Sequence, residues 1–295
     1  MHIVYHLGAH CTDEERLLRC LLKNRGVLAD QGIIIPGPAR YRNLLRDTAI
    51  ALKGQSASLD TQALVLEQIM DEDHAERLVL SWESFLSFAP WVLKGTLYPA
   101  AAERIRAFSQ VFPEIQAEFF LAIRNPATFL PALFEKQKSD KTRGKTYAGF
   151  MEGVDLFNLR WSDVIEGVRA ENPDVPLTIW CDEDTPLIWP EVLQAITRHD
   201  HSITLEGSDE LLAQIMSAEG MTRLRAYLLA HPPTSAEVRR KVVSAFLDKF
   251  AVPEKINMEF ELPGWTEDTV AALTRTYDAD VARIMAMSDV RFISP

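Results

Sequence analysis

The sequence predicts an α/β protein in which helices flank a parallel sheet and the C-terminal part is helical. Short apolar runs, rich in branched or aromatic residues, alternate with longer segments whose apolar residues recur at helical spacing. After Trp180 the helical pattern continues and no strand is expected. Such alternation is typical of a parallel sheet covered on both faces, because each crossover helix packs against the sheet.

Four short runs are the predicted strands, and residues 33–35 form a fifth, shorter candidate. Each run is brief and ends at polar or turn residues. The four cover residues 3–7, 78–80, 119–123 and 175–180. Because right-handed crossovers place the loops that follow parallel strands at one edge of a sheet, any chemistry is expected at that edge.

Helical stripes lie between and after these runs. They are formed by Leu17, Leu18, Leu21, Leu22 and Leu28; by Ile105, Phe108 and Phe112; by Leu211, Leu212, Ile215 and Met216; by Val238, Val242, Phe246 and Phe250; and by Val270, Leu273, Tyr277, Val281 and Ile284. We therefore predict an α/β domain over residues 1–205, with a helical extension over 206–295 packed on the same domain.

The composition of the chain excludes or disfavours several classes of protein and ligand. The chain has 295 residues, 47% of them hydrophobic, which suffices for a large core and excludes wholesale disorder. With 31 basic against 42 acidic residues the net charge is −11, which disfavours nucleic acid and polyanionic substrates. No run is long and apolar enough for a membrane span, and no signal-peptide pattern opens the chain.

The cysteine count points to a reducing compartment. Cys11, Cys20 and Cys181 are too few and too scattered for a disulfide framework or a four-cysteine zinc site. We expect a cytoplasmic protein without a metal centre. The sequence also lacks a Gly-Lys-Ser/Thr motif, so ordinary ATP or GTP hydrolysis is not expected.

The segment HLGAHCTDEERL, residues 6–17, follows the first predicted strand and opens a helix. Such a loop points backbone N–H groups and the positive end of the helix dipole at a bound anion. The segment resembles the first motif of bacterial sulfotransferases, His-x-Gly-x-His-Lys-Thr-Gly/Ala-Thr-Thr. That resemblance implies a P-loop-type fold and a loop that holds the 5′-phosphosulfate of 3′-phosphoadenosine 5′-phosphosulfate (PAPS). The implied cofactor-binding residues are Gly8, Ala9, His10, Cys11 and Thr12.

This loop departs from the family pattern at its charged positions. Cys11 replaces the lysine, and residues 13–15, Asp-Glu-Glu, replace the small residue and two threonines. The lysine would neutralise the transferring group, whereas ionised carboxylates only accept hydrogen bonds. One carboxylate about 4 Å from a phosphate costs about 1 kcal/mol in water and more in a dry site. The alternative is an acidic helix N-terminus that follows a loop without nucleotide function.

A second segment, residues 119–137, resembles the family's second motif, in which Arg-Asp-Pro ends a strand and a serine follows eight residues after the arginine. Arg124 and Pro126 match, Asn125 replaces the aspartate, and Ala132 replaces the serine. The resemblance implies that Arg124 binds the 3′-phosphate of PAPS. The alternative is an arginine at a strand end that pairs with a nearby carboxylate.

Candidate catalytic residues are Glu83 and His10. Residues 78–85, LVLSWESF, resemble the Ser-x-Glu of the bacterial branch, which implies Glu83 as the general base. The alternative is a capping or salt-bridged glutamate. Cys11 beside a helix N-terminus, with His10 as its base, is a further hypothesis for a nucleophile.

Two charged runs stay open to two interpretations each. Residues 182–184, Asp-Glu-Asp, would bind a cation or an amine-bearing acceptor, or form a solvated run or cap the next helix. The basic segment 135–145 would cover a bound anion as a lid, or form a solvated loop.

Two function classes follow. The first is sulfuryl transfer from PAPS to a hydroxyl or amine of a small-molecule acceptor, which the sequence does not identify. The second is a non-catalytic protein of the same fold that keeps the cleft for a small molecule or a protein partner. The missing lysine and serine favour the second class.

Overall fold

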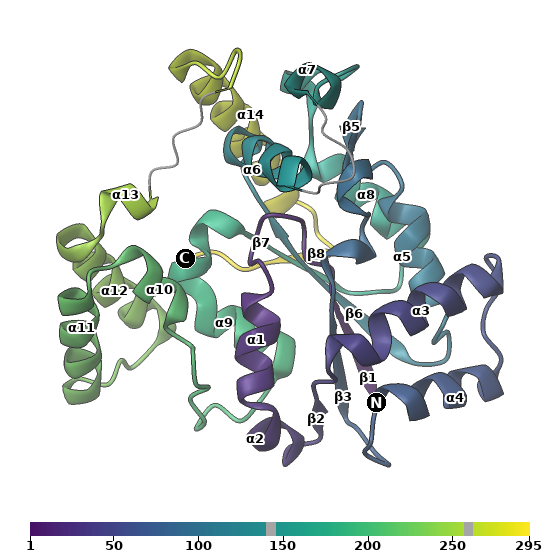
Figure 1. The fold of residues 1–295 in the computed structure, drawn as a ribbon. Helices are drawn as coiled ribbons and strands as arrows, with labels where there is room; N and C mark the ends of the chain where they lie inside the picture. Colours follow the sequence, from purple (N-terminus) through teal and green to yellow (C-terminus); the bar gives the residue numbers. More distant parts are fainter. Residues whose placement is uncertain (140–145, 257–261) are drawn as a thin grey trace.

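The computed structural model describes residues 1–139, 146–256 and 262–295 and confirms the predicted α/β class. A six-stranded parallel sheet has the order β2-β3-β1-β6-β7-β8 (Figure 1). Its strands are β1 (His2–His6), β2 (Ile33–Ile34), β3 (Arg77–Ser81), β6 (Gln116–Ile123), β7 (Leu177–Cys181) and β8 (Val290–Phe292). Strands β4 (Leu93–Lys94) and β5 (Thr96–Leu97) form a separate antiparallel pair.

Strand β8 corrects the expectation that no strand follows Trp180. It pairs with the N-terminal part of β7, with Leu177 opposite Val290 and Ile179 opposite Phe292. The strand has three residues and lies at the sheet edge, where one face is partly exposed. So short a run, with an arginine at its centre, gives no periodicity that distinguishes a strand from a loop.

Helices occupy most of the rest of the chain, and none of those in the described residues is long and apolar enough to cross a membrane. They are α1 (Arg16–Lys23), α2 (Arg25–Ala29), α3 (Pro38–Leu52), α4 (Leu59–Ile69), α5 (Ala101–Ser109), α6 (Pro126–Ser139), α7 (Tyr147–Phe150), α8 (Trp161–Glu171), α9 (Thr185–Thr197), α10 (Glu210–Ile215), α11 (Ala218–Ala230), α12 (Ala236–Phe250), α13 (Pro253–Ile256) and α14 (Glu267–Met285). Short 3-10 turns are η1 (Glu83–Phe85), η2 (Ala89–Trp91), η3 (Leu156–Asn158) and η4 (Asp182–Asp184).

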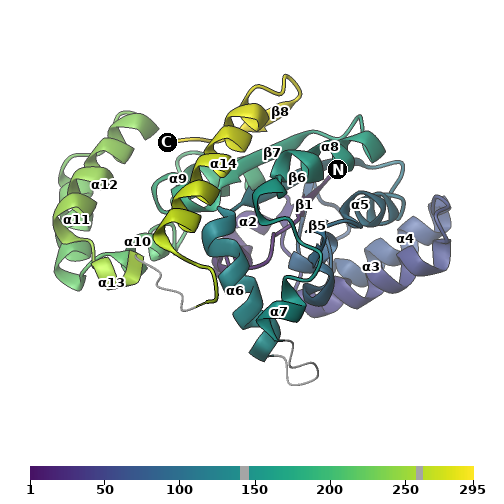
Figure 2. The same ribbon diagram turned by 90° about the horizontal axis from the view of Figure 1, so that it is seen from above.

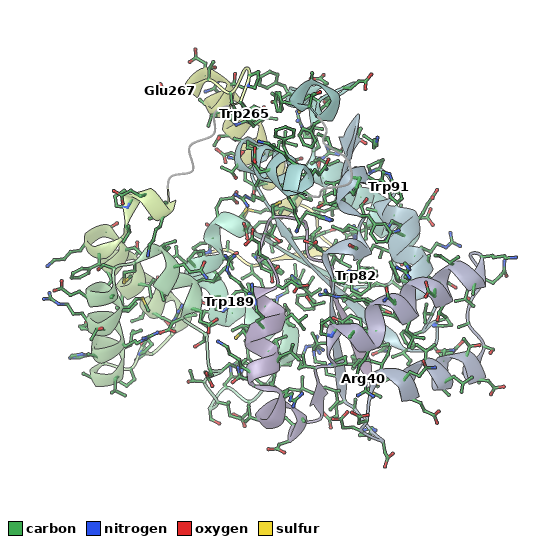
Figure 3. The ribbon with its side chains drawn as sticks, viewed as in Figure 1. Arg40, Trp82, Trp91, Trp189, Trp265 and Glu267 are labelled. Carbon is green, nitrogen blue, oxygen red and sulfur yellow. The ribbon has the colours of Figure 1, made fainter. Side chains whose placement is uncertain are left out.

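The sheet separates two apolar cores, because successive side chains of a strand point to opposite faces. Ile3 and Tyr5 of β1 belong to the core under α3, α5, α6 and α8, whereas Val4 belongs to the core under α1, α2 and α9. Trp82 lies in the first core and Trp189 in the second (Figure 3). Both faces are thus covered, as the near-continuous apolar strands predict.

The chain after residue 205 follows two different paths. Helices α10, α11 and α12 form their own small core around Leu212, Met221 and Val243, beside α9 and away from the sheet (Figure 2). Helix α14 and strand β8 then return to the main sheet, where α14 packs against α6 and α8. The C-terminal part is therefore helical, as predicted, but its last segment completes the α/β core.

Candidate functional site

The topology makes the carboxyl end of the central strands the candidate place for a ligand site. From β1 the chain runs to β2 and β3 on one side of the sheet, and it then continues with β6, β7 and β8 on the other side. Ligands in open α/β sheets bind at such a reversal, outside the carboxyl ends of the strands. The loop over residues 7–15 leaves β1 here, Glu83 follows β3, Arg124 follows β6 and residues 182–184 follow β7.

The first loop is held by its own groups. Gly8 has φ +51°, a backbone conformation that glycine adopts without strain, and it lies against the backbone of Glu83. The Thr12 hydroxyl donates to the carbonyl of Ala9 at 2.6 Å. The Asp13 carboxylate accepts from the amide of Leu17 at 3.0 Å, at the start of α1. The loop lies at the predicted strand-to-helix turn, but a carboxylate of the chain itself caps the helix that an anion would face.

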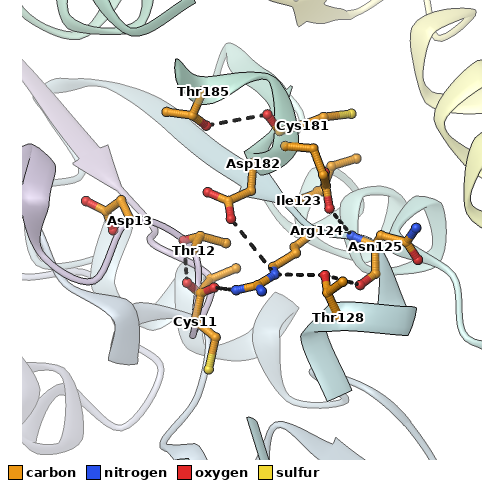
Figure 4. A network of polar contacts seen from close by, with 12 residues as sticks. Cys11, Thr12, Asp13, Ile123, Arg124, Asn125, Thr128, Cys181, Asp182 and Thr185 are labelled. Atoms are coloured by element: carbon orange, nitrogen blue, oxygen red, sulfur yellow. Dashed lines mark hydrogen bonds and ion pairs between the residues drawn. The ribbon is translucent and has the colours of Figure 1, made fainter. Parts of the chain in front are cut away.

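Arg124 is 7% exposed and ties three segments together (Figure 4). Its Nη1 donates to the carbonyl oxygen of Cys11, and its Nε donates to Thr128 Oγ1 at 3.0 Å. The same Nε lies 4.0 Å from Asp182 Oδ2. The guanidinium thus joins the first loop, α6 and the end of β7, which agrees with the alternative in which it pairs with a nearby carboxylate.

The acidic run after β7 is built into this network. Burial raises the pKa of Asp182 to about 7, although the neighbouring Arg124 opposes that shift. Glu183 accepts from the Asn125 amide at 2.7 Å and from the Tyr277 hydroxyl at 3.1 Å. These two carboxylates therefore anchor the end of β6 and helix α14.

Glu83, the predicted general base, forms an ion pair. The ammonium of Lys136, on α6, donates to Glu83 Oε2. A paired carboxylate would have to give up this contact before it accepted a proton from a substrate. Lys136 belongs to the basic segment predicted as a lid or a solvated loop, and Lys141, Arg143 and Lys145 of that segment lie outside the described residues.

His10 is fully buried against Tyr98. The His10 amide donates to Tyr98 Oη at 2.9 Å, and the same hydroxyl lies 3.1 Å from His10 Nδ1. Since Oη accepts from the amide, its own hydrogen is available to Nδ1, which assigns the proton of the neutral ring to Nε2. Nε2 has no hydrogen-bond partner among the described residues. Burial lowers the pKa of His10 to about 4, so the ring is neutral at pH 7.

Cys11 is a protonated thiol at neutral pH. Burial raises its pKa to about 11, and the nearby Lys136 and Arg124 offset this only in part. Cys11 with His10 as its base thus lacks the thiolate that a nucleophile needs, and this hypothesis remains a prediction that alkylation can test.

We expect iodoacetamide to alkylate Cys11 about 100-fold more slowly in the folded protein than in the unfolded chain at pH 7.5. The reason is that each pKa unit above the ordinary thiol value removes about tenfold of the thiolate. Peptide mass spectrometry over time measures the rate, with the same protein in guanidinium chloride as the control. Rapid modification of Cys11 alone in the folded protein would instead support a reactive nucleophile.

An open cleft of about 530 Å³ adjoins the loop. Four carboxylates and one ammonium line it, from Glu14, Glu15, Glu83, Glu135 and Lys136, together with Cys11 and Ala132. Ala132, at the position of the family's serine, offers no hydroxyl here.

No sequence pattern indicates several of the contacts in this network. Tyr98 lies in no motif, and its contact with His10 spans 88 positions. Thr128 lies in the first turn of α6, whereas Arg124 precedes that helix, so helical spacing does not pair them. The contact between Glu183 and Tyr277 joins α14 to this edge across 94 positions, which the sequence does not indicate.

The described residues contain no group of three or more His, Cys, Asp or Glu side chains arranged to hold a metal ion. Comparisons with protein-family models, with curated proteins and with solved structures found no match to this chain.

Proposed function

We propose that this protein is a sulfotransferase-like binding protein that does not use PAPS and whose cleft binds an amine-bearing small molecule. The observation that carries the proposal is that the chain's own groups occupy the positions at which the resemblance implies bound anions. Arg124 bonds to Cys11 and Thr128, and Asp13 caps α1. A 3′-phosphate and a 5′-phosphosulfate would each have to displace these contacts, and Cys11 offers no charge in exchange.

The charge of the cleft supports the ligand class. Its lining presents four carboxylates against one ammonium. Arg42 pairs with Glu15, Arg16 with Glu14 and Lys138 with Glu135, but none of these three cations is part of the lining. A ligand ammonium between Glu14 and Glu135 would complement this surface, whereas each phosphate would meet repulsion of about 1 kcal/mol per close carboxylate in water.

The rest of the proposal concerns setting and partners. The three cysteines are free and buried, which supports a reducing, cytoplasmic location. The net charge of −11 supports small molecules over nucleic acid as partners. Sulfuryl transfer with Glu83 as the base is the competing function, and the ion pair between Glu83 and Lys136 argues against it.

Calorimetric titration separates the two functions. We expect no saturable heat with 3′-phosphoadenosine 5′-phosphate, the product nucleotide, so that any Kd for it lies above about 1 mM. Spermidine, an aliphatic polyamine, is expected to bind. The variant Glu14→Gln/Glu135→Gln should weaken spermidine binding about 30-fold, since it removes two nearby carboxylates worth about 1 kcal/mol each.

A matched control removes the same charge elsewhere. Glu67→Gln/Glu254→Gln neutralises two exposed carboxylates on α4 and α13, and its spermidine affinity should equal that of the parent. Micromolar binding of the nucleotide that Arg124→Ala abolishes would overturn the proposal in favour of the PAPS enzyme. Equal weakening in both double variants would show a net-charge effect without a site.

A further inference from the structure

A second cavity, of about 460 Å³, lies beside α14 and apart from the cleft. One face of α14 supplies Arg275, Thr276, Asp280 and Arg283 together with two alanines, and Arg160 joins them from the residue before α8. None of the residues that line this cavity also lines the cleft. We refer to Arg160, Arg275, Thr276 and Arg283 as the arginine pocket.

The lining of this cavity contains three arginines and one carboxylate. Three guanidinium groups face one hollow in a chain whose net charge is −11. The single carboxylate of the lining, Asp280, is 4% exposed, and its two oxygens accept from Trp161 N, Ser162 N and Ser162 Oγ. That carboxylate is therefore directed to the start of α8.

The three arginines differ in how far they are already engaged. Arg160 donates to the carbonyls of Phe157 and Leu159, each at 2.9 Å. Arg283 pairs with Glu166 at 2.6 Å and lies 3.9 Å from Asp163. Arg275 is exposed and has no hydrogen bond or ion pair with any described residue. The next residue, Thr276, adds a hydroxyl to the same lining.

We propose that the arginine pocket binds a small, multiply charged oxyanion of the phosphate class. A guanidinium presents parallel N–H donors that match two oxygens of one phosphoryl group. Arg275 supplies that fork, Thr276 a further hydroxyl donor, and Arg160 adds positive potential, whereas Glu166 offsets the charge of Arg283. The volume falls in the range of small-molecule pockets, about 300–1,000 Å³. This inference is independent of the amine-binding cleft.

Calorimetric titration with inorganic pyrophosphate tests the pocket. We expect saturable binding with a Kd below about 1 mM, which weakens as salt shortens the Debye length from about 10 Å at 0.1 M. Arg275→Gln should weaken binding at least about tenfold, and Thr276→Val by a smaller factor. Arg25→Gln, an exposed arginine at the start of α2, is the control and should bind as the parent does.

The other outcomes decide against the pocket. Heats without saturation, or equal losses in the Arg275 and Arg25 variants, would show that pyrophosphate responds to overall charge only. Displacement of pyrophosphate by an acidic decapeptide, with higher affinity than pyrophosphate itself, would assign the surface to a protein partner and overturn the small-oxyanion proposal. The Glu14→Gln/Glu135→Gln variant should leave pyrophosphate binding unchanged.

Discussion

Replacing Asp280 with alanine is expected to destabilise the protein by about 3–5 kcal/mol, because three buried donors at the start of α8 lose their acceptor. Its carboxylate accepts from Trp161 N at 2.7 Å, from Ser162 N at 3.2 Å and from Ser162 Oγ at 2.5 Å. Each buried donor left unsatisfied costs about 1–3 kcal/mol, and the losses overlap. Thermal unfolding should show a fall in Tm of about 10 °C.

Two variants test whether the cap is the cause. Asp278→Ala removes an exposed aspartate two residues earlier on α14 and should change Tm little. Asp280→Asn keeps one acceptor oxygen and should lie between the parent and Asp280→Ala. If Asp280→Ala costs no more than Asp278→Ala, the donors of α8 find water or other partners, and this interpretation fails. The loss of the Asp280 contacts should also disturb the candidate site, since Trp161 Nε1 donates to the Arg124 carbonyl at 2.8 Å.

The fold was largely predictable because buried parallel strands are local signals. The runs at Ile3, Leu78, Phe119 and Leu177 are short and apolar, and each forms a strand of the sheet. Strand β8 was missed because an edge strand of three residues carries no such signal. The return of α14 to the sheet depends on contacts such as Asn125 with Thr274, which span 149 positions.

The position of the candidate site was predictable from the sequence, but the contacts of its side chains were not. The strand-to-helix turn after β1 and the position of Arg124 after β6 follow from the topology of a parallel sheet. The sequence therefore predicts that both lie at the carboxyl edge of this sheet. What each side chain contacts there depends on residues from distant elements. The partner of Glu83 is 53 positions away, and that of His10 is 88 positions away. The motif positions alone therefore suggest a general base at Glu83 and a phosphate-binding residue at Arg124. The contacts instead show Glu83 in an ion pair and Arg124 joined to neighbouring segments of the chain.

Asp182 offers the second large effect, and it depends on pH. The folded protein holds the proton of Asp182 with a pKa of about 7, against an ordinary value of 3.8. The folded state therefore binds this proton more tightly than the unfolded chain, and stability declines as the pH rises from about 4 to 7. At about 1.36 kcal/mol per pKa unit, the penalty above pH 7 reaches at most about 4 kcal/mol.

Asp182→Asn removes the ionised form and with it this penalty. We expect the variant to be more stable than the parent by about 1–4 kcal/mol at pH 8, with the gain vanishing toward pH 4, where the parent is also neutral. The loss of the contact with Arg124 at 4.0 Å reduces the gain. Urea unfolding across this pH range measures it, and Asp174→Asn, an exposed aspartate before β7, controls for removal of a surface charge. A variant less stable than the parent at pH 8 would mean that attraction to Arg124 outweighs the cost of burying the Asp182 charge.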